Sequence, residues 1–327
     1  MRSAFVGFDS AWGGKTKGGI CTAIFDGGRL ERFCTPEPAS FDHATATVEQ
    51  CRRDADYTLV AIDQPTMVPN ACGMRPVEKV AGALKTGVQP AYLRSKMWWP
   101  NAPIWTFLDN LCPNEDPRKA RSDTDGLHVI EVFPGLALPA FVGALAHAAK
   151  RKDFRYNPKS SNFAVEDWNL VTSAVRKQAK RAGLAPFTDW TRPMCGLDVS
   201  QKPSKADQDG LDALICLIIA RKWRCGDEDT HVLGDWRGHI VTPLSEGGRR
   251  KIEASAIKRC VPVRCGSWEL HDAALGYFEG NHYDAFEWLS HPAVALGGDT
   301  PIEHAGKPGG TQDVTDLLGR MAHGIPT

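Results

Sequence analysis

The sequence predicts an α/β fold, in which helices flank a mixed β-sheet, followed by a small all-α module at the C-terminal end. Two observations predict the first part: three successive apolar, β-branched stretches open the chain, and an amphipathic helical pattern then leads into a nearly continuous apolar strand. A third observation predicts the module, since the end of the chain holds only short helical patterns broken by Pro and Gly. We expect residues 1–245 to form the α/β domain, residues 246–261 a linker and residues 262–327 the module.

The sheet is expected to begin as an antiparallel meander. Three apolar and β-branched stretches follow one another, at residues 3–12, 18–27 and 29–36. The Asp-Gly-Gly sequence at residues 26–28 supplies the turn between the second and third of them. Residues 41–54 then have helical periodicity, and residues 57–65 form an apolar run of the kind that is buried on both faces of a sheet. A helical crossover therefore adds a parallel strand and makes the sheet mixed.

The rest of the α/β domain alternates irregular and regular stretches. Residues 65–125 are rich in Pro, Gly, Asn and Trp, which favours loops and short helices over the edge of the sheet. A strand and two helices are expected after them, at residues 128–135, 162–183 and 204–226. Ser204 followed by Asp207 resembles a capping box at the start of the last helix. The basic run from Lys177 to Arg181 is expected to be a solvated helix face, with a phosphate-binding face as the alternative.

Composition limits the classes of function. Lys plus Arg equals Asp plus Glu at 39 each, so no global positive field attracts nucleic acid, and any such site must be a local patch. The ten cysteines contain no C-x-x-C pair, which indicates reduced core residues rather than a zinc site or a disulfide framework. The longest apolar run, residues 213–220, is too short to span a bilayer. We therefore expect a cytoplasmic protein of bacterial type with no membrane partner.

The stretch FVGFDSAWGGKT, residues 5–16, ends like a phosphate-binding P-loop but does not fit one. Gly14, Lys15 and Thr16 match the end of the G-x-x-x-x-G-K-[ST] pattern, whereas Asp9 occupies the position of its first glycine. The residues that follow predict a strand rather than the helix that would hold phosphate at its N-terminus. Asp9, at the end of an apolar strand, therefore needs another explanation.

Four acidic residues stand inside or at the end of apolar elements: Asp9, Asp63, Glu131 and Asp212. An unpaired buried carboxylate is costly, so each needs a partner, a proton or a cation. Asp212 is followed on the same helical face by the apolar residues Cys216 and Ile219, and Asp209 lies one turn before it, about 5–6 Å away. Asp209 and Asp212 therefore form a carboxylate pair.

If this pair meets the two strand-end aspartates, the carboxylates repel by roughly 4 kcal/mol per pair at about 4 Å and an effective dielectric near 20. Such a cluster favours Mg²⁺ or Mn²⁺, the ions of two-metal phosphoryl hydrolysis. The alternative for each residue is structural. A strand-end Asp can cap a turn, Glu131 can pair with an arginine such as Arg75, and Asp209 can interact with the helix dipole.

The order of these acids resembles a known fold. Asp9 on a first strand, Asp63 on the fourth and DGLDAL on a late helix are similar to the RNase H superfamily, and the D-x-x-D-A-L helix is similar to its Holliday-junction resolvases. The ordered set GFDSAWGG, VAIDQP, MRPVEKV, IEVFPGLAL, DQDGLDALICLIIA and GHIVTP resembles the DUF429 family, predicted nucleases with an RNase H-like fold. The resemblance covers residues 3–245.

The resemblance implies a metal-dependent nuclease. Its metal-site acids would be Asp9, Asp63 and Asp212, with Asp209 and Glu131 as supporting ligands in the catalytic set. Arg75 stands in the segment similar to the family's Arg-rich motif, and it would bind substrate phosphate or hold Glu131. Glu78 departs from the Asp expected in that motif. We also expect Lys15 to contact the substrate.

The end of the chain carries a second resemblance. Residues 285–326 contain W-L, P, A-L-G-G, P, then G, V, L-L and a terminal H-G, in a pattern similar to the C-terminal toxin-binding domain of MbcA/ParS/Xre antitoxins. The resemblance implies a RES-type toxin partner or self-association through residues 262–327. The alternative is a helical dimerisation tail, because Val314, Leu317, Leu318 and Met321 form an apolar stripe.

Three functions compete at this point. The first is a metal-dependent phosphodiesterase acting on nucleic acid, and the second is a non-catalytic, antitoxin-like or regulatory binding protein on the same scaffold. The third, an actin-like nucleotide-binding fold, shares the meander and the first-strand Asp, but it normally needs two such halves.

Overall fold

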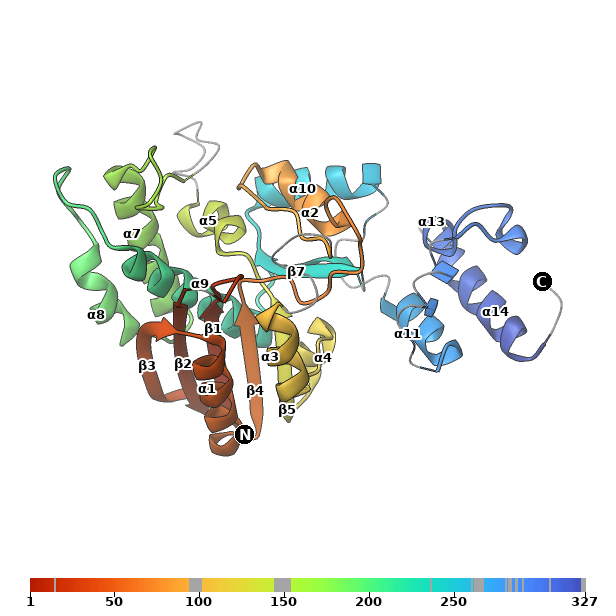
Figure 1. Ribbon diagram of the computed structural model, residues 1–327, viewed down its shortest axis with the longest axis horizontal. Coiled ribbons are helices and arrows are strands. Elements are labelled where there is room, and N and C mark those ends of the chain that lie inside the picture. The colour runs from red at the N-terminus through yellow and green to blue at the C-terminus, as the bar shows by residue number, and fades with distance from the viewer. Residues whose placement is uncertain are drawn as a thin grey trace.

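The computed structural model describes residues 1–14, 16–93, 102–143, 154–235, 237–259, 261, 268–279, 281, 284–285, 288–289, 291–305 and 307–324. Figure 1 shows a large α/β body that carries the N-terminus and a smaller helical body that carries the C-terminus. The predicted fold class, a mixed α/β sheet with flanking helices and a helical C-terminal module, is confirmed.

The central sheet has five strands in the order β3-β2-β1-β4-β5. Their bounds are Arg2–Asp9 (β1), Gly18–Asp26 (β2), Arg29–Ala39 (β3), Tyr57–Ile62 (β4) and Gly126–Glu131 (β5). The first three strands are antiparallel, whereas β4 runs parallel to β1 and β5 parallel to β4. Gly27 and Gly28 have φ values of 53° and 85°, which glycine adopts without steric cost in the β2–β3 turn. The predicted meander and crossover are therefore present.

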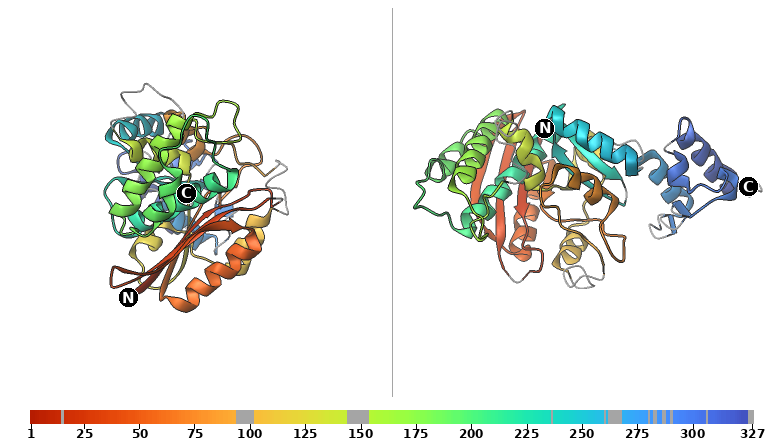
Figure 2. Two further views of the ribbon diagram at one scale, coloured as in Figure 1. Left: turned by 90° about the vertical axis from the view of Figure 1, so that its left-hand side faces the viewer. Right: turned by 90° about the horizontal axis from the view of Figure 1, so that it is seen from above.

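Helices cover both faces of the sheet. Helix α1 (Phe41–Asp54) and α3 (Pro103–Leu111) pack on one face, where Phe8 meets Phe41 and Phe107. On the other face lie α5 (Pro134–Val142), α7 (Val165–Arg181) and α9 (Lys205–Arg224). The left view of Figure 2 shows the red strands between orange α1 and the green helices. Alternate β1 side chains enter the two cores, as Phe5 and Phe8 illustrate.

Helix α9 crosses β1 at very short range. A Cβ on Gly7 would lie 2.1 Å from the carbonyl oxygen of Ala213, and a Cβ on Gly19 would lie 2.3 Å from that of Asp209. Only glycine permits this approach, since real Cβ contacts do not fall below 3.0 Å. The approach brings the start of α9 over the end of β1, and the predicted Ser204–Asp207 capping box begins the helix.

A second, two-stranded sheet lies beside the central sheet. Strands β6 (Thr230–Asp235) and β7 (Gly238–Pro243) form an antiparallel hairpin, which packs with α2 (Pro76–Ala81) and α10 (Glu246–Arg259) in one apolar cluster. Most of the expected linker, residues 246–261, is therefore the helix α10, and its Ile252 and Ala256 are buried against the domain. Shorter elements complete the body: η1 (Gly82–Leu84), α4 (Pro117–Ser122), α8 (Phe187–Thr191) and η2 (Arg192–Met194), with the bridge Asn114–His128.

The C-terminal module has a core of its own. It contains α11 (Trp268–Tyr277), η3 (Val294–Leu296), α13 (Pro301–Ala305) and α14 (Gly310–Ala322). Val314, Leu317 and Leu318 of α14 are buried against Leu270 and Ala274 of α11. The apolar stripe noted in the sequence therefore forms the core of the module. Within the described residues, no helix is both long and apolar enough to cross a membrane.

Candidate active site

Three aspartates from separate elements come together at one edge of the sheet. Asp9 ends β1, Asp63 directly follows β4, and Asp212 lies near the start of α9. Because β1 and β4 are parallel neighbours, their carboxyl ends lie side by side. The backbone N–H of Asp63 donates to the Phe8 carbonyl at 2.9 Å, which fixes Asp63 beside Asp9. The close crossing of α9 brings in Asp212.

These carboxylates share a buried environment. Asp9 is 9% exposed and Asp212 is 5% exposed, while Asp63 is partly buried. Burial raises the pKa of Asp9 well above its usual range, and the charges of Asp212, Asp63 and Asp209 raise it further. Burial also raises the pKa of Asp63, with Asp212 and Glu131 adding to the effect, and its carboxyl is close enough to Asp9 for a hydrogen bond. Without a cation, these acids therefore retain protons at pH values where exposed aspartates have lost them.

Asp212 has two hydrogen-bond donors. The Tyr156 hydroxyl donates to its Oδ1 at 2.8 Å, and Nε2 of Gln208 donates to its Oδ2 at 2.9 Å. Burial raises the pKa of Asp212 to about 6, against the opposing effects of Lys205 and of these two donors. Tyr156 cannot be identified from the sequence, because it lies in an irregular stretch 56 residues before Asp212. No periodicity or spacing connects the two.

Asp209 lies close enough to raise the pKa of both Asp9 and Asp212, and it also makes an ion pair. Its partner is the Lys205 ammonium, one helical turn earlier. Although burial opposes it, the hydrogen bond to Asp209 and the charges of Asp9 and Asp212 raise the pKa of Lys205. Lys205 is therefore a resident positive charge beside the carboxylates, and no motif in the sequence indicates this role.

Glu131 is engaged by Arg75, which is 1% exposed. Nη1 of Arg75 donates to Oε2 of Glu131 at 2.8 Å, and Nη2 donates to Oε1 at 2.5 Å. Nε of Arg75 donates to Oε1 of Glu78 at 2.8 Å, and Nη1 also donates to the Met67 carbonyl at 2.8 Å. Four of the five N–H donors are thus used inside the protein. Of the two roles implied for Arg75, this geometry supports holding Glu131.

Two small cavities lie beside Asp63 and beside Tyr156. One of about 120 Å³ is lined by Asp63 and Trp12, together with Arg75, Glu131 and mostly apolar side chains. The Trp12 indole N–H donates to the Asp63 carbonyl at 2.7 Å, which fixes the ring at this opening. Another cavity, of about 110 Å³, is lined by Tyr156. Lys15 lies outside the described residues.

The carboxylates suit a hard divalent cation in donor chemistry and charge. Oxygen ligands and uncompensated negative charge are what Mg²⁺ and Mn²⁺ require. In the part of the chain that the structure describes, however, no three His, Cys, Asp or Glu side chains are already arranged to hold a metal ion. Both oxygens of Asp212 have donors, so Asp9 and Asp63 are the carboxylates most open to a cation.

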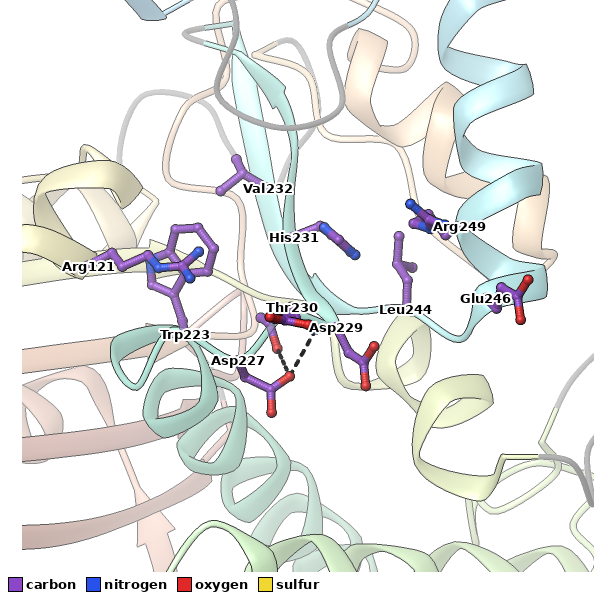
Figure 3. A pocket seen from close by; sticks show the side chains of 11 residues that line it. Arg121, Trp223, Asp227, Asp229, Thr230, His231, Val232, Leu244, Glu246 and Arg249 are labelled. Carbon is purple, nitrogen blue, oxygen red and sulfur yellow. Dashed lines mark hydrogen bonds between the residues drawn. The ribbon is translucent and has the colours of Figure 1, made fainter. Parts of the chain in front are cut away.

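A larger cavity, of about 680 Å³, lies away from these residues (Figure 3). Its lining mixes cations and acids, including Arg121, Arg249, Asp227 and Glu246. The guanidinium carbon of Arg121 lies 4.7 Å from the centroid of the Trp223 ring. Nη1 of Arg249 lies 3.6 Å from Oε1 of Glu253. None of the acids identified in the sequence lines this cavity. Size alone therefore does not identify the chemical site.

Comparisons with known proteins agree with both resemblances. Residues 273–324 match the antitoxin Xre/MbcA/ParS C-terminal toxin-binding domain. No curated protein and no solved structure matched the chain. Residues 7–235, which include all the strand and helix acids described above, match the family described as protein of unknown function DUF429. The chain therefore belongs to the DUF429 family and carries an antitoxin-type toxin-binding domain at its C-terminal end.

Proposed function

We propose that the α/β body is a divalent-cation-dependent phosphodiesterase that acts on nucleic acid. The observation that carries this proposal is the convergence of Asp9, Asp63 and Asp212 from two parallel strands and one helix, with the pKa of each carboxyl raised. Buried acids that raise each other's pKa are common at functional sites, because their mutual repulsion destabilises the fold. A cation offsets that repulsion and gives the cluster a function.

The three aspartates and Lys205 would have separate roles. Asp9 and Asp63 would hold Mg²⁺ or Mn²⁺, and Asp212 would complete the set, oriented by Tyr156 and Gln208. A bound cation of this kind supplies an activated water and stabilises the leaving oxygen of a phosphodiester. Lys205 keeps a positive charge beside the acids and would attract the substrate phosphate.

Hydrolysis of labelled oligonucleotides tests this proposal. Single- and double-stranded DNA and RNA are incubated with Mg²⁺, with Mn²⁺ and with a chelator. We expect cation-dependent cleavage that falls at least 100-fold in Asp9→Asn and Asp63→Asn. Asp26→Asn is the matched control, since this carboxylate is 67% exposed at the far end of β2. Absence of cleavage for every substrate, by protein that is folded and binds the cation, would contradict the proposal.

A second function is supported by the match of residues 273–324 to a toxin-binding domain. We propose that the module binds a toxin of the RES type, either in addition to hydrolysis or as the sole function of a non-catalytic, antitoxin-like protein. Affinity capture from the host, with the full chain and with a chain ending at residue 261, distinguishes these possibilities. A toxin retained only by the full chain is expected, whereas identical partners for both chains would exclude toxin binding by the module.

A further inference from the structure

Arg221, near the end of α9, forms no ion pair within the described residues. Its guanidinium carbon lies 4.0 Å from the centroid of the Phe25 ring and 5.3 Å from that of Phe5. Its Nε is buried and has no hydrogen-bond partner among the described residues. Burial lowers the pKa of Arg221, and the charge of Arg224 adds to this effect. The aromatic rings stabilise a cation, which offsets part of the cost of its desolvation.

The Arg221 side chain lines a cavity of about 420 Å³. Three cations face it, Arg181, Arg221 and Lys222, together with the two carboxylates of Asp227 and Asp229. Lys222 is paired with Asp227 at 2.6 Å. Asp227 also accepts hydrogen bonds from Thr230 and from the backbone of Asp229, as Figure 3 shows at the edge of the neighbouring cavity. Two arginines therefore remain against one carboxylate.

The positive charge continues along α7. Lys177 lies one helical turn before Arg181 on the same face, and Lys180 is adjacent to it. All three side chains are exposed, and none has an ion pair or hydrogen bond to another side chain of the described structure. Together with the cavity, these residues form a local basic track on a chain whose net charge is zero. The track ends at Arg221.

We propose that this cavity binds a backbone phosphate of a nucleic-acid strand, with the α7 cations contacting adjacent phosphates. A guanidinium presents planar donors that match the oxygens of a phosphate, and an unneutralised arginine gains most from such an anion. An open row of exposed cations beside the cavity favours a strand over a single small anion. The identity of the ligand rests on the proposed function, but the site does not depend on hydrolysis. Arg221 lies nine positions after Asp212 on α9, a distance of about 13.5 Å along the helix axis at 1.5 Å per residue.

Fluorescence anisotropy of a labelled 20-nucleotide single strand, DNA or RNA, measures binding directly. The assay is run in chelator so that no strand is cleaved. Arg221→Gln removes the guanidinium over Phe25 and its charge but keeps a polar side chain, and Arg181→Gln removes an exposed charge without disturbing the core. Arg192→Gln is the matched control, because Arg192 is 68% exposed and paired with Asp189 on α8.

We expect Kd to rise about tenfold in Arg221→Gln and at least threefold in Arg181→Gln, with Arg192→Gln unchanged. The slope of log affinity against log salt concentration should become shallower by about 0.7 for each phosphate that the variant no longer neutralises. Thermal melting shows whether each variant is folded, and Arg181→Gln tests the site even if Arg221→Gln is unstable. Equal affinity and equal salt slope for Arg181→Gln and the control would overturn the proposal.

Competition with inorganic phosphate distinguishes the two ligands that could occupy the cavity, a phosphate of a nucleic-acid strand and a free phosphate ion. We expect it to displace the strand no better than chloride at equal ionic strength, since a single anion occupies only one of the phosphate positions. Saturable binding of inorganic phosphate with no binding of the strand would overturn the assignment to nucleic acid. The binding assay contains chelator, so its result does not depend on whether the protein hydrolyses nucleic acid. If the strand does not bind, the hydrolysis assay still tests the proposed function separately.

Discussion

Replacing Asp212 with Asn should stabilise the protein at neutral pH. Burial raises the pKa of this carboxyl to about 6, compared with about 3.8 for an exposed Asp. One pKa unit corresponds to about 1.4 kcal/mol, so ionising Asp212 in the folded protein costs about 3 kcal/mol at pH 7.5. Asn removes this cost but weakens the hydrogen bonds from Tyr156 and Gln208, which costs about 1 kcal/mol. The expected net gain is about 2 kcal/mol.

The sign of the pH dependence follows from the raised pKa. Between the unfolded and folded pKa values the folded protein binds more protons, so stability is highest below about pH 4 and falls until the pH exceeds about 6. At pH 4.5 ionising Asp212 costs only about 1 kcal/mol. Asn removes that cost, but its weaker hydrogen bonds lose about the same amount of stability. The advantage of Asp212→Asn should therefore be close to zero there.

Thermal unfolding in chelator, from pH 4.5 to pH 8, measures this difference. We expect the Tm of Asp212→Asn to exceed that of the wild type by roughly 4–6 °C at pH 7.5 and to equal it at pH 4.5. Asp26→Asn, at an exposed carboxylate, should have no effect at either pH. A lower Tm at pH 7.5, or the same difference at both pH values, would refute the reasoning that Asp212 is a strained, buried acid.

The other predictions concern the buried ion network, the helix crossing and Tyr156. Arg75→Leu leaves Glu131 and Glu78 buried without a cation, so denaturant unfolding should show a loss of about 3–5 kcal/mol, and a loss below about 1 kcal/mol would contradict the network. Gly7→Ala forces α9 away from β1 and should cost about 3 kcal/mol or more, whereas Gly13→Ala, with no atom within 4 Å of the added Cβ, should cost little. Tyr156→Phe removes a hydrogen-bond donor that lowers the pKa of Asp212, so the pKa should rise in the variant. The Mn²⁺ affinity measured by calorimetry should therefore fall at pH 6.5 and recover by pH 8. An effect of equal size at both pH values would argue against this role.

Much of the fold is predictable because its signals are local. The apolar stretches that become β1, β2 and β4, the turn glycines and the Ser204–Asp207 cap each depend on a few adjacent residues. Helix α10 is not predictable in this way, because Gly247 and Gly248 stand in its first turn and only a few of its residues, such as Ile252, are buried. Ile252 and Ala256 pack with apolar residues of α2, which is distant in the sequence, and of the β6–β7 hairpin, and a local sequence pattern does not report such contacts.

The same distinction applies to the site. Asp9, Asp63 and Asp212 can be found because a carboxylate inside an apolar element is conspicuous. The interactions between them depend on distances across the chain, so the Tyr156–Asp212 bond cannot be predicted from the sequence. The sequence leaves open whether Arg75 binds phosphate or holds Glu131, and only the three-dimensional arrangement shows how its donors are used.

Calorimetric titration of Mn²⁺ into the full-length protein at pH 7.5 tests the central claim most directly. We predict saturable binding to the wild type and to Asp26→Asn, and its loss in both Asp9→Asn and Asp63→Asn. That result would mean that two parallel strands build one cation site. Undiminished binding in the folded Asp9→Asn and Asp63→Asn variants, or no binding to the wild type, would contradict it.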